Sequence, residues 1–253
     1  MIHLHKEVIG EIHFLHLVKA DIAEQALPTV IYFHGFNGEK ESSLTLAYKM
    51  VEKGLRVILP DSKHHGERRG DITARELDLS FWEIILQNIH ELEVIKDSLV
   101  SKGLTDGERV GIGGTSMGGI ATYAALAEHS WLKAGAVLMG AANLTEYARD
   151  LIARFNKTHN ESLAEADVAG PLAMLQEYDL SIHPEKLLNR SLFIWHGKED
   201  PVVPIELSQS FYDQIKDDYQ SEENLLFIQE EGRLHHLSKL SMNSAAEWFH
   251  KHL

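Results

Sequence analysis

The chain has 253 residues, which suits one large domain or two small ones, and it contains no cysteine. Disulfide bonds, thiolate nucleophiles and thiolate metal ligands are therefore excluded. Its 38 acidic residues outnumber its 24 basic residues, and the net charge of −14 repels phosphate backbones, so we expect no nucleic-acid partner.

The first 18 residues alternate polar and apolar side chains on either side of Gly10. This pattern predicts an antiparallel hairpin of residues 2–9 and 11–18. The same stretch lacks the basic start and the unbroken apolar run of a signal peptide. No apolar run in the chain approaches the roughly 18 residues that a membrane-spanning helix needs. We expect a cytoplasmic protein without a membrane partner.

Short apolar runs alternate with amphipathic stretches through the rest of the chain. The runs predict buried strands at residues 29–35, 55–61, 108–114, 134–140, 191–197 and 224–230. Helical periodicity predicts helices at residues 43–53, 75–100 and 241–253. Strands that are apolar throughout are typical of a parallel sheet that is covered on both faces. We therefore predict an α/β fold with a mostly parallel central sheet and helices on both faces.

Residues 141–190 contain no obvious strand and interrupt this alternation. Asn143 and Glu146 match a capping pair at the start of a helix, and the apolar positions from Leu144 to Phe155 fall on one helical face. Further along, Gly170-Pro171 is expected to break the next helical piece. We interpret the segment as a small helical cap inserted into a single domain that spans residues 1–253.

The sequence Gly114-Thr115-Ser116-Met117-Gly118 lies between a predicted strand and a predicted helix. It matches the G-x-S-x-G pattern, in which a sharp strand-to-helix turn exposes a serine and brings its flanking residues too close together for side chains. The alternatives are a glycine-rich phosphate loop and a plain tight turn. A Walker-type loop is excluded because no Gly-Lys-Ser/Thr follows. We predict that Ser116 is a nucleophile.

A serine nucleophile needs a base, and the base needs an acid that orients it. The acid is expected in the loop after a later strand, where "HGKEDPVVP" places Asp200 beyond the strand at 191–197. Glu199 lies next to it and is interpreted as a solvated loop carboxylate. We predict Asp200 as the acid.

The base is expected after the last strand, where "EGRLHHLS" contains His235 and His236. Only one of two adjacent imidazoles can face the serine. The Gly-x-x-His spacing from Gly232 favours His235, and His236 remains the alternative base.

The other histidines could in principle bind a metal ion. His3 and His5, or His13 and His16, are spaced along the predicted hairpin, but no carboxylate pattern completes a site around them. We therefore predict neither a metal ion nor a cofactor.

Five stretches together carry a resemblance to a known superfamily: "HGFNGEK", "LPDSKHHGERRG", "GGTSMGG", "WHGKEDPVVP" and "EGRLHHLS". With the order Ser116, Asp200, His235, the chain resembles α/β-hydrolases over essentially its full length. It is most similar to small bacterial esterases related to the prolyl-oligopeptidase and dienelactone-hydrolase branches. The resemblance implies a Ser-His-Asp hydrolase that acts on esters without a cofactor. Dienelactone hydrolases use a cysteine nucleophile, and Ser116 departs from them.

The same resemblance implies an oxyanion hole made of two backbone N–H groups. One belongs to Met117, which follows the nucleophile, and the other to Phe36, which follows the His-Gly pair in "FHGF". His34 is expected to brace this loop rather than to react. Residues 64–70 either line the rim of the pocket or form a solvated loop, and the solvated loop is favoured.

The leading hypothesis is a carboxylesterase that cleaves a small-molecule ester through an acyl-enzyme intermediate. A serine peptidase or amidase is the first alternative, because the prolyl-oligopeptidase branch shares this catalytic domain. A non-catalytic binding protein on a hydrolase fold is the second alternative, and the intact candidate triad argues against it. The physiological substrate and the oligomeric state have no signature in the sequence.

Overall fold

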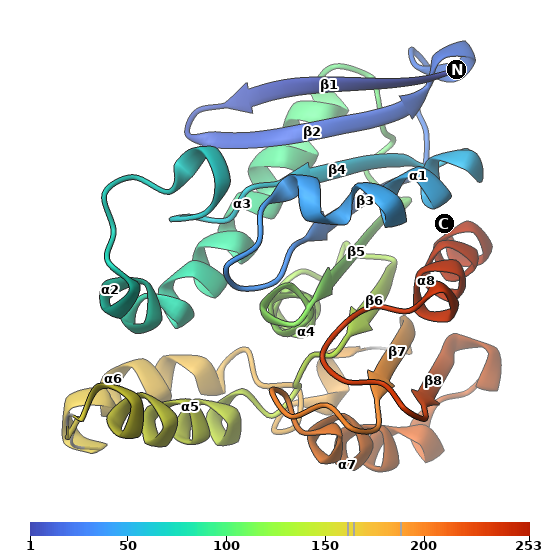
Figure 1. Cartoon of the computed structure of the whole chain (residues 1–253). Helices are drawn as coiled ribbons and strands as arrows, with labels where there is room; N and C mark the ends of the chain where they lie inside the picture. Colours follow the sequence, from blue (N-terminus) through green and yellow to red (C-terminus); the bar gives the residue numbers. More distant parts are fainter. Residues whose placement is uncertain (161, 164, 188) are drawn as a thin grey trace.

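The computed structural model describes residues 1–160, 162–163, 165–187 and 189–253. In these residues the strands form one sheet with the order β1-β2-β4-β3-β5-β6-β7-β8 (Figure 1). Their bounds are β1 Ile2–Ile9, β2 Ile12–Lys19, β3 Thr29–Phe33, β4 Arg56–Pro60, β5 Val110–Thr115, β6 Ala134–Leu138, β7 Ser191–Gly197 and β8 Leu225–Glu230. The hairpin β1–β2 is antiparallel and joins β4 antiparallel, whereas the pairs from β4 to β8 are parallel. The predicted hairpin and mostly parallel sheet are confirmed.

Helices cover both faces of the sheet. Their bounds are α1 Leu44–Glu52, α2 Ala74–Leu79, α3 Phe81–Ser101, α4 Met117–Glu128, α5 Leu144–His159, α6 Glu165–Gln176, α7 Ile205–Ile215 and α8 Lys239–His252. Helices α1 and α8 pack on one face, and α3, α4 and α7 pack on the other (Figure 1). The side chains of successive strand residues, such as Tyr32 and Phe33, point to opposite faces of the sheet and pack into different hydrophobic cores. This is why the strands are apolar throughout.

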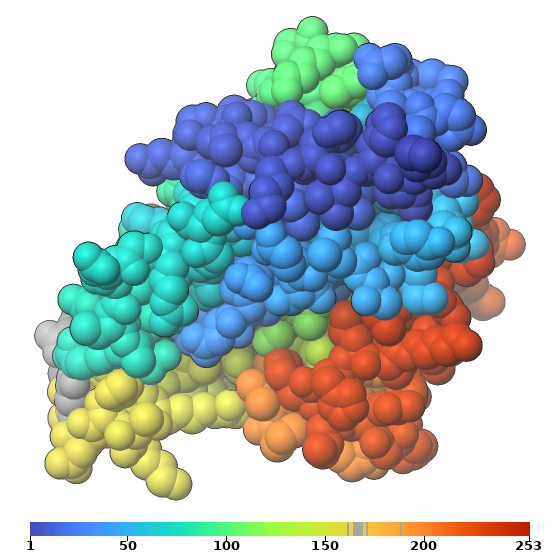
Figure 2. Space-filling model, turned by 45° about the horizontal axis from the view of Figure 1, so that its top comes forward, coloured from blue at the N-terminus to red at the C-terminus, as the bar shows by residue number. Residues whose placement is uncertain are grey.

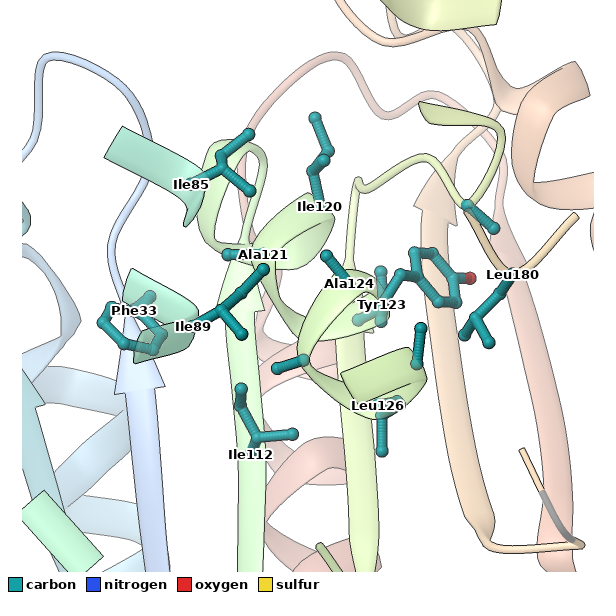
Figure 3. Close-up of a cluster of buried hydrophobic side chains, with 14 of the residues drawn as sticks. Phe33, Ile85, Ile89, Ile112, Ile120, Ala121, Tyr123, Ala124, Leu126 and Leu180 are labelled. Atoms are coloured by element: carbon teal, nitrogen blue, oxygen red, sulfur yellow. The ribbon is translucent and has the colours of Figure 1, made fainter. Parts of the chain in front are cut away.

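Helix α4 lies against the centre of the sheet. Ile112 of β5 packs there with Ile120 of α4 and with Ile85 and Ile89 of α3, and each of these side chains is fully buried (Figure 3). Small residues at other positions of α4 let the helix approach the strands closely. This packing fixes the start of α4, and therefore fixes Ser116.

The turn between β5 and α4 is tightly packed. Ser116 has φ 55° and ψ −115°, a strained conformation for a residue with a side chain. A Cβ atom on Gly114 would lie 2.1 Å from the backbone of Gly118, and one on Gly118 would lie 2.2 Å from the carbonyl oxygen of Phe33. These glycines are therefore required because strand, helix and neighbouring strand touch through their backbones.

Two helical predictions differ from the structure. The helix predicted over residues 75–100 is divided at Ser80, where the backbone N–H donates to the carbonyls of both Glu76 and Leu77 and the hydroxyl adds a hydrogen bond to the carbonyl of Glu76 at 2.8 Å. The prediction that Gly170-Pro171 breaks a helix is wrong, because α6 continues through both residues. Proline removes one helical hydrogen bond and crowds one carbonyl, which here does not end the helix.

Helices α5 and α6 are the main elements of residues 141–190, which connect β6 to β7, and the described part of this segment contains no strand. Asn143 precedes α5 as predicted, but its side chain makes no capping hydrogen bond with the backbone and instead lies 3.5 Å from the carboxylate of Glu146. The two helices form a layer at the end of the sheet where the parallel strands terminate (Figure 1).

We predict that Gly114→Ala will lower the free energy of unfolding by about 3 kcal/mol or more, because overpacking against rigid backbone typically costs about 1–3 kcal/mol and this overlap is severe. Thermal and urea unfolding measure the change. Gly170→Ala is the control, since an added Cβ there meets nothing within 4 Å. Equal stability of the two variants would show that the turn tolerates a side chain.

Candidate active site

Three side chains from distant parts of the chain form one hydrogen-bonded series. Ser116 Oγ lies 2.8 Å from His235 Nε2, and His235 Nδ1 lies 2.7 Å from Asp200 Oδ2. Ser116 follows β5, Asp200 follows β7 and His235 follows β8, so parallel strands bring all three to one edge of the sheet. The structure thus places the predicted nucleophile, base and acid within hydrogen-bond distance of one another.

The two residues that sequence reasoning kept as alternatives point elsewhere. His236 is exposed, and its imidazole makes no hydrogen bond with any residue that the structure describes. Its backbone N–H instead donates to the carbonyl of Leu234 at 2.9 Å. Glu199 is exposed as well, whereas the carboxylate of Asp200 is 0% exposed. Neither His236 nor Glu199 contacts Ser116.

The carboxylate of Asp200 is held on both oxygens. Oδ1 accepts hydrogen bonds from the backbone N–H groups of Val202 at 2.8 Å and Val203 at 3.1 Å, while Oδ2 faces His235. Burial works to raise the pKa of Asp200, but hydrogen bonds from His196, His235 and the Val202 N–H outweigh it and hold the pKa well below its usual range. Asp200 is therefore ionised and can stabilise a charged imidazole at His235.

His196 is a second imidazole beside Asp200 that sequence reasoning treated only as the end of a strand. It is fully buried, and its Nε2 lies 2.9 Å from the carbonyl of Val203 and 3.3 Å from Asp200 Oδ2. Two acceptors around Nε2 require the proton on that nitrogen. Its Nδ1 lies 2.8 Å from the hydroxyl of Ser208, which anchors the ring to α7. His196 thereby fixes the loop that carries the acid.

The two backbone N–H groups assigned by resemblance to an oxyanion hole are free of partners among the described residues. Within the described chain, neither the N–H of Phe36 nor that of Met117 has a hydrogen-bond partner. The loop after β3 passes close to the serine, since a Cβ on Gly35 would lie 3.5 Å from the Cβ of Ser116. Met117 is the first residue of α4, where the helix dipole adds positive potential.

His34 and His65 brace the loop that contains Phe36. His34 Nδ1 donates to the carbonyl of Gly35 at 2.8 Å, and its Nε2 accepts from the N–H of Ser62 at 3.1 Å. The two rings lie 5.1 Å apart, and Nε2 of His65 accepts from the N–H of Asn37 at 3.2 Å. Sequence reasoning expected the bracing role of His34 but missed His65.

Both imidazoles must be neutral to accept these N–H groups. Burial lowers the pKa of His34 to about 4 and outweighs the hydrogen bond to Gly35. Burial lowers the pKa of His65 as well. At neutral pH each ring therefore keeps the lone pair on Nε2 that fixes the loop.

A buried ion pair holds the neighbouring segment. Lys40 Nζ lies 2.6 Å from Asp61 Oδ2, and both side chains are 2% exposed or less. Burial alone would lower the pKa of Lys40, but hydrogen bonds to Asp61 and Glu67 raise it above its usual value. Asp61 also accepts the backbone N–H groups of Lys40 and Glu67, so the pair ties the loop after β3 to residues 61–67.

Residues 64–70 do not line the cavity that contains Ser116, and they are not simply solvated. His65 is buried, and Arg68 pairs with Glu91 at 2.6 Å. Part of the segment lines a separate surface hollow of about 690 Å³ beside the hairpin. Near Ser116, the segment of residues 64–70 therefore supports the loop after β3 through His65.

Ser116 opens into a cavity of about 710 Å³. The wall combines residues around α2 and α3 with residues of α5 and α6, which adjoin on the surface in Figure 2 as the teal and yellow regions. Most of the lining side chains are apolar or aromatic: Phe36, Leu79, Phe81, Trp82, Leu86, Tyr147, Leu151, Ile152, Phe155, Leu163, Leu172, Met174, Leu175 and Val202. The cavity therefore suits an apolar group that lies beside Ser116.

The described residues contain no group of three or more histidine, aspartate or glutamate side chains arranged to hold a metal ion. His16, one of the histidines considered as a ligand, instead bonds to Glu7 at 2.6 Å. No helix among the described residues is both long and apolar enough to cross a membrane.

Comparison with known proteins supports a hydrolase of the kind that the sequence motifs resemble. The model of the prolyl oligopeptidase family matches residues 88–253. YitV of Bacillus subtilis strain 168, provisionally named an esterase, is 40% identical over 255 residues, and esterase YjfP of Escherichia coli K12 is 29% identical over 258 residues, with 100% of both chains covered in each case. The structure of TT1662 from Thermus thermophilus matches with a TM-score of 0.77 at 19% identity, over 99% of this chain and 98% of that one.

This chain belongs to the prolyl oligopeptidase family, and it is a small hydrolase with the α/β-hydrolase fold. The resemblance inferred from the motifs is thereby confirmed at the level of family and fold.

We predict that lowering the pH from 6.5 to 4 will weaken the fold partly through His34. Its folded pKa of about 4 lies below the unfolded value, so in this window the unfolded chain binds a proton that the folded chain does not, and stability rises with pH. The contribution is about 3 kcal/mol across the window. Urea unfolding at several pH values should give a shallower pH dependence for His34→Gln than for wild type. His236→Gln, at an exposed position, is the control, and an unchanged slope in His34→Gln would contradict the assignment.

Proposed function

We propose that this protein is a serine esterase in which Ser116, His235 and Asp200 act as a catalytic triad on small carboxylic esters. The observation that carries the proposal is the hydrogen-bonded series from Ser116 to Asp200, which opens into an apolar cavity. The two relatives that align over the full chain carry esterase names, which agrees with ester rather than amide substrates.

The proposed reaction has two halves. His235 Nε2 takes the proton of Ser116 as Oγ attacks the carbonyl carbon of the ester, and the N–H groups of Phe36 and Met117 stabilise the negative oxygen that forms. The carbon–oxygen bond to the alcohol then breaks, and the alcohol leaves with the proton from His235. Water attacks the acyl-enzyme by the same route in reverse and releases the acid. Asp200 stabilises the imidazolium in both halves.

The substrate is proposed to be a small molecule of modest size, neither nucleic acid nor membrane lipid. The net charge of −14 disfavours nucleic acid, and the cavity of about 710 Å³ limits the acyl group. We propose that residues 141–190 form a cap within the single domain, because Leu151, Ile152 and Phe155 of α5 form part of the cavity wall.

Peptidase activity is the second candidate, because the family model is named for prolyl oligopeptidase and one similar structure is described as a puromycin-hydrolyzing peptidase. Assaying p-nitrophenyl esters beside aminoacyl and prolyl p-nitroanilides separates the two activities. The esterase proposal expects turnover of the esters to exceed turnover of the anilides.

We predict that Ser116→Ala and His235→Ala will each lower kcat on a p-nitrophenyl ester by about 10⁴–10⁶-fold, as triad substitutions do in other serine hydrolases. His236→Ala is the matched control and should lose at most about tenfold, because its imidazole is exposed and unpaired within the described chain. Circular dichroism checks the fold of each variant. Greater damage from His236→Ala than from His235→Ala would assign the base to His236.

We predict that Leu151→Ala and Phe155→Ala will shift the preferred acyl length toward longer chains, because each enlarges the wall of the cavity. The measurement is kcat/KM across p-nitrophenyl esters from acetate to decanoate. Leu240→Ala, at an exposed position on α8, is the control. An unchanged chain-length profile in both cavity variants would show that α5 packs on the domain without contacting the acyl group.

A further inference from the structure

Tyr147 stands out among the polar side chains of the Ser116 cavity. Three of the other polar groups in the wall are already paired: Asp78 with His159 at 3.0 Å, Glu83 with Lys63 at 2.6 Å, and Arg154 with the carbonyl of Val202 at 2.7 Å. Tyr147 as a whole is only 3% exposed, but its hydroxyl is not among the fully buried polar atoms, and it forms no hydrogen bond with any residue that the structure describes.

Two other lining residues, Asn37 and Thr158, also lack side-chain partners within the described chain, but both are exposed, so solvent satisfies them whether or not a ligand is bound. A donor in the wall of an enclosed cavity loses its water when an apolar group fills the cavity, and this costs free energy unless the ligand supplies an acceptor. Tyr147 is therefore the polar group in this wall that a bound substrate would satisfy.

Tyr147 lies at the same edge of the sheet as Ser116 and Asp200. Tyr147 is on the first turn of α5, directly after β6, and β6 lies between the strands that precede Ser116 and Asp200. Its ring lies edge-on to Trp82 of α3 at 6.5 Å between centroids. Burial raises the pKa of Tyr147 to about 12; Arg154 lowers it and Asp200 raises it. The phenol therefore stays protonated, and a hydrogen bond that it donates to an acceptor stabilises it.

The side of the ester that faces Tyr147 follows from the lining of the cavity. The alcohol leaves with the proton of His235, so it must lie beside that imidazole, yet His235 is not among the residues that line the cavity. Ser116 and Phe36 are among them. The enclosed space beside Tyr147 is therefore the space for the acyl group.

We propose, on the basis of the esterase function proposed above, that Tyr147 is a specificity-determining residue whose hydroxyl donates a hydrogen bond to an oxygen carried by the acyl chain. The preferred substrates are esters of apolar acids that bear a keto, ether or hydroxyl oxygen along the chain. A site built to hydrogen-bond one substrate oxygen rejects the analogue that lacks it far more strongly than an apolar pocket rejects a change of size.

The test compares p-nitrophenyl hexanoate with p-nitrophenyl 4-oxohexanoate and 5-oxohexanoate. Wild type should hydrolyse at least one oxo ester with a higher kcat/KM than hexanoate. Tyr147→Phe should lower kcat/KM on that oxo ester by about 10–100-fold and change hexanoate turnover by less than about twofold. Titration of active sites with a fluorophosphonate corrects every rate for the folded fraction.

Tyr123→Phe is the matched control. Its hydroxyl is buried and unpaired within the described residues, and Tyr123 does not line the cavity: its ring packs in the core against Phe211, and its hydroxyl points toward Leu180 (Figure 3). This variant should leave both classes of ester unchanged.

Equal loss on hexanoate and on the oxo esters would overturn the proposal, because the hydroxyl would then act on the reacting ester or on the fold. No change on any ester would overturn it as well. In both cases the esterase function would still be supported if wild type hydrolyses the hexanoate ester and Ser116→Ala does not. Absence of any ester turnover in wild type would reject the esterase function and this proposal together.

Discussion

The backbone contact between β3, the end of β5 and the start of α4 is the constraint on which the rest of the site depends. Gly118 touches the carbonyl of Phe33, and Gly114 touches Gly118, so the strand can enter the helix only through a turn that forces Ser116 to a positive φ. That turn raises the serine hydroxyl above the sheet and leaves the N–H of Met117 unpaired within the described chain. The same contact brings the loop with Phe36 against the serine. Ser116 and the backbone N–H groups of Phe36 and Met117, the proposed nucleophile and oxyanion donors, are thus positioned by one packing arrangement.

Two different kinds of support hold the loops around this turn. The loop after β3 depends on neutral imidazoles, because His34 and His65 must accept backbone N–H groups with unprotonated nitrogens. The loop after β7 depends on charge, because Asp200 is ionised and is surrounded by donors from His196, His235 and the backbone. Acid therefore weakens the first loop well before it neutralises Asp200. The loop that carries Phe36 and the loop that orients His235 through Asp200 therefore depend on different interactions.

The sequence was sufficient to predict the sheet, the turn and the residues that the structure brings together as Ser116, His235 and Asp200. Each follows a strand, and the ends of parallel strands meet at one edge whatever the details of packing. The exposure of His236 agrees with the spacing argument from Gly232.

What the sequence could not predict depends on contacts between distant segments. His65 reaches Asn37 across 28 positions, and His196, which lies 3.3 Å from Asp200, is anchored by Ser208, 12 positions further along the chain. The unpaired hydroxyl of Tyr147 has no local signature either, since apolar periodicity alone placed it on the buried face of α5. The continuation of α6 through Pro171 likewise overrides a local preference.

The most direct test of the central claim is to locate the covalent adduct formed by a fluorophosphonate probe. Intact-mass measurement followed by peptide mapping identifies the modified residue and the number of adducts per chain. The account predicts a single adduct on Ser116, with its formation slowed strongly in His235→Ala and little in His236→Ala. An adduct on another residue, or an active esterase that the probe leaves unmodified, would contradict it.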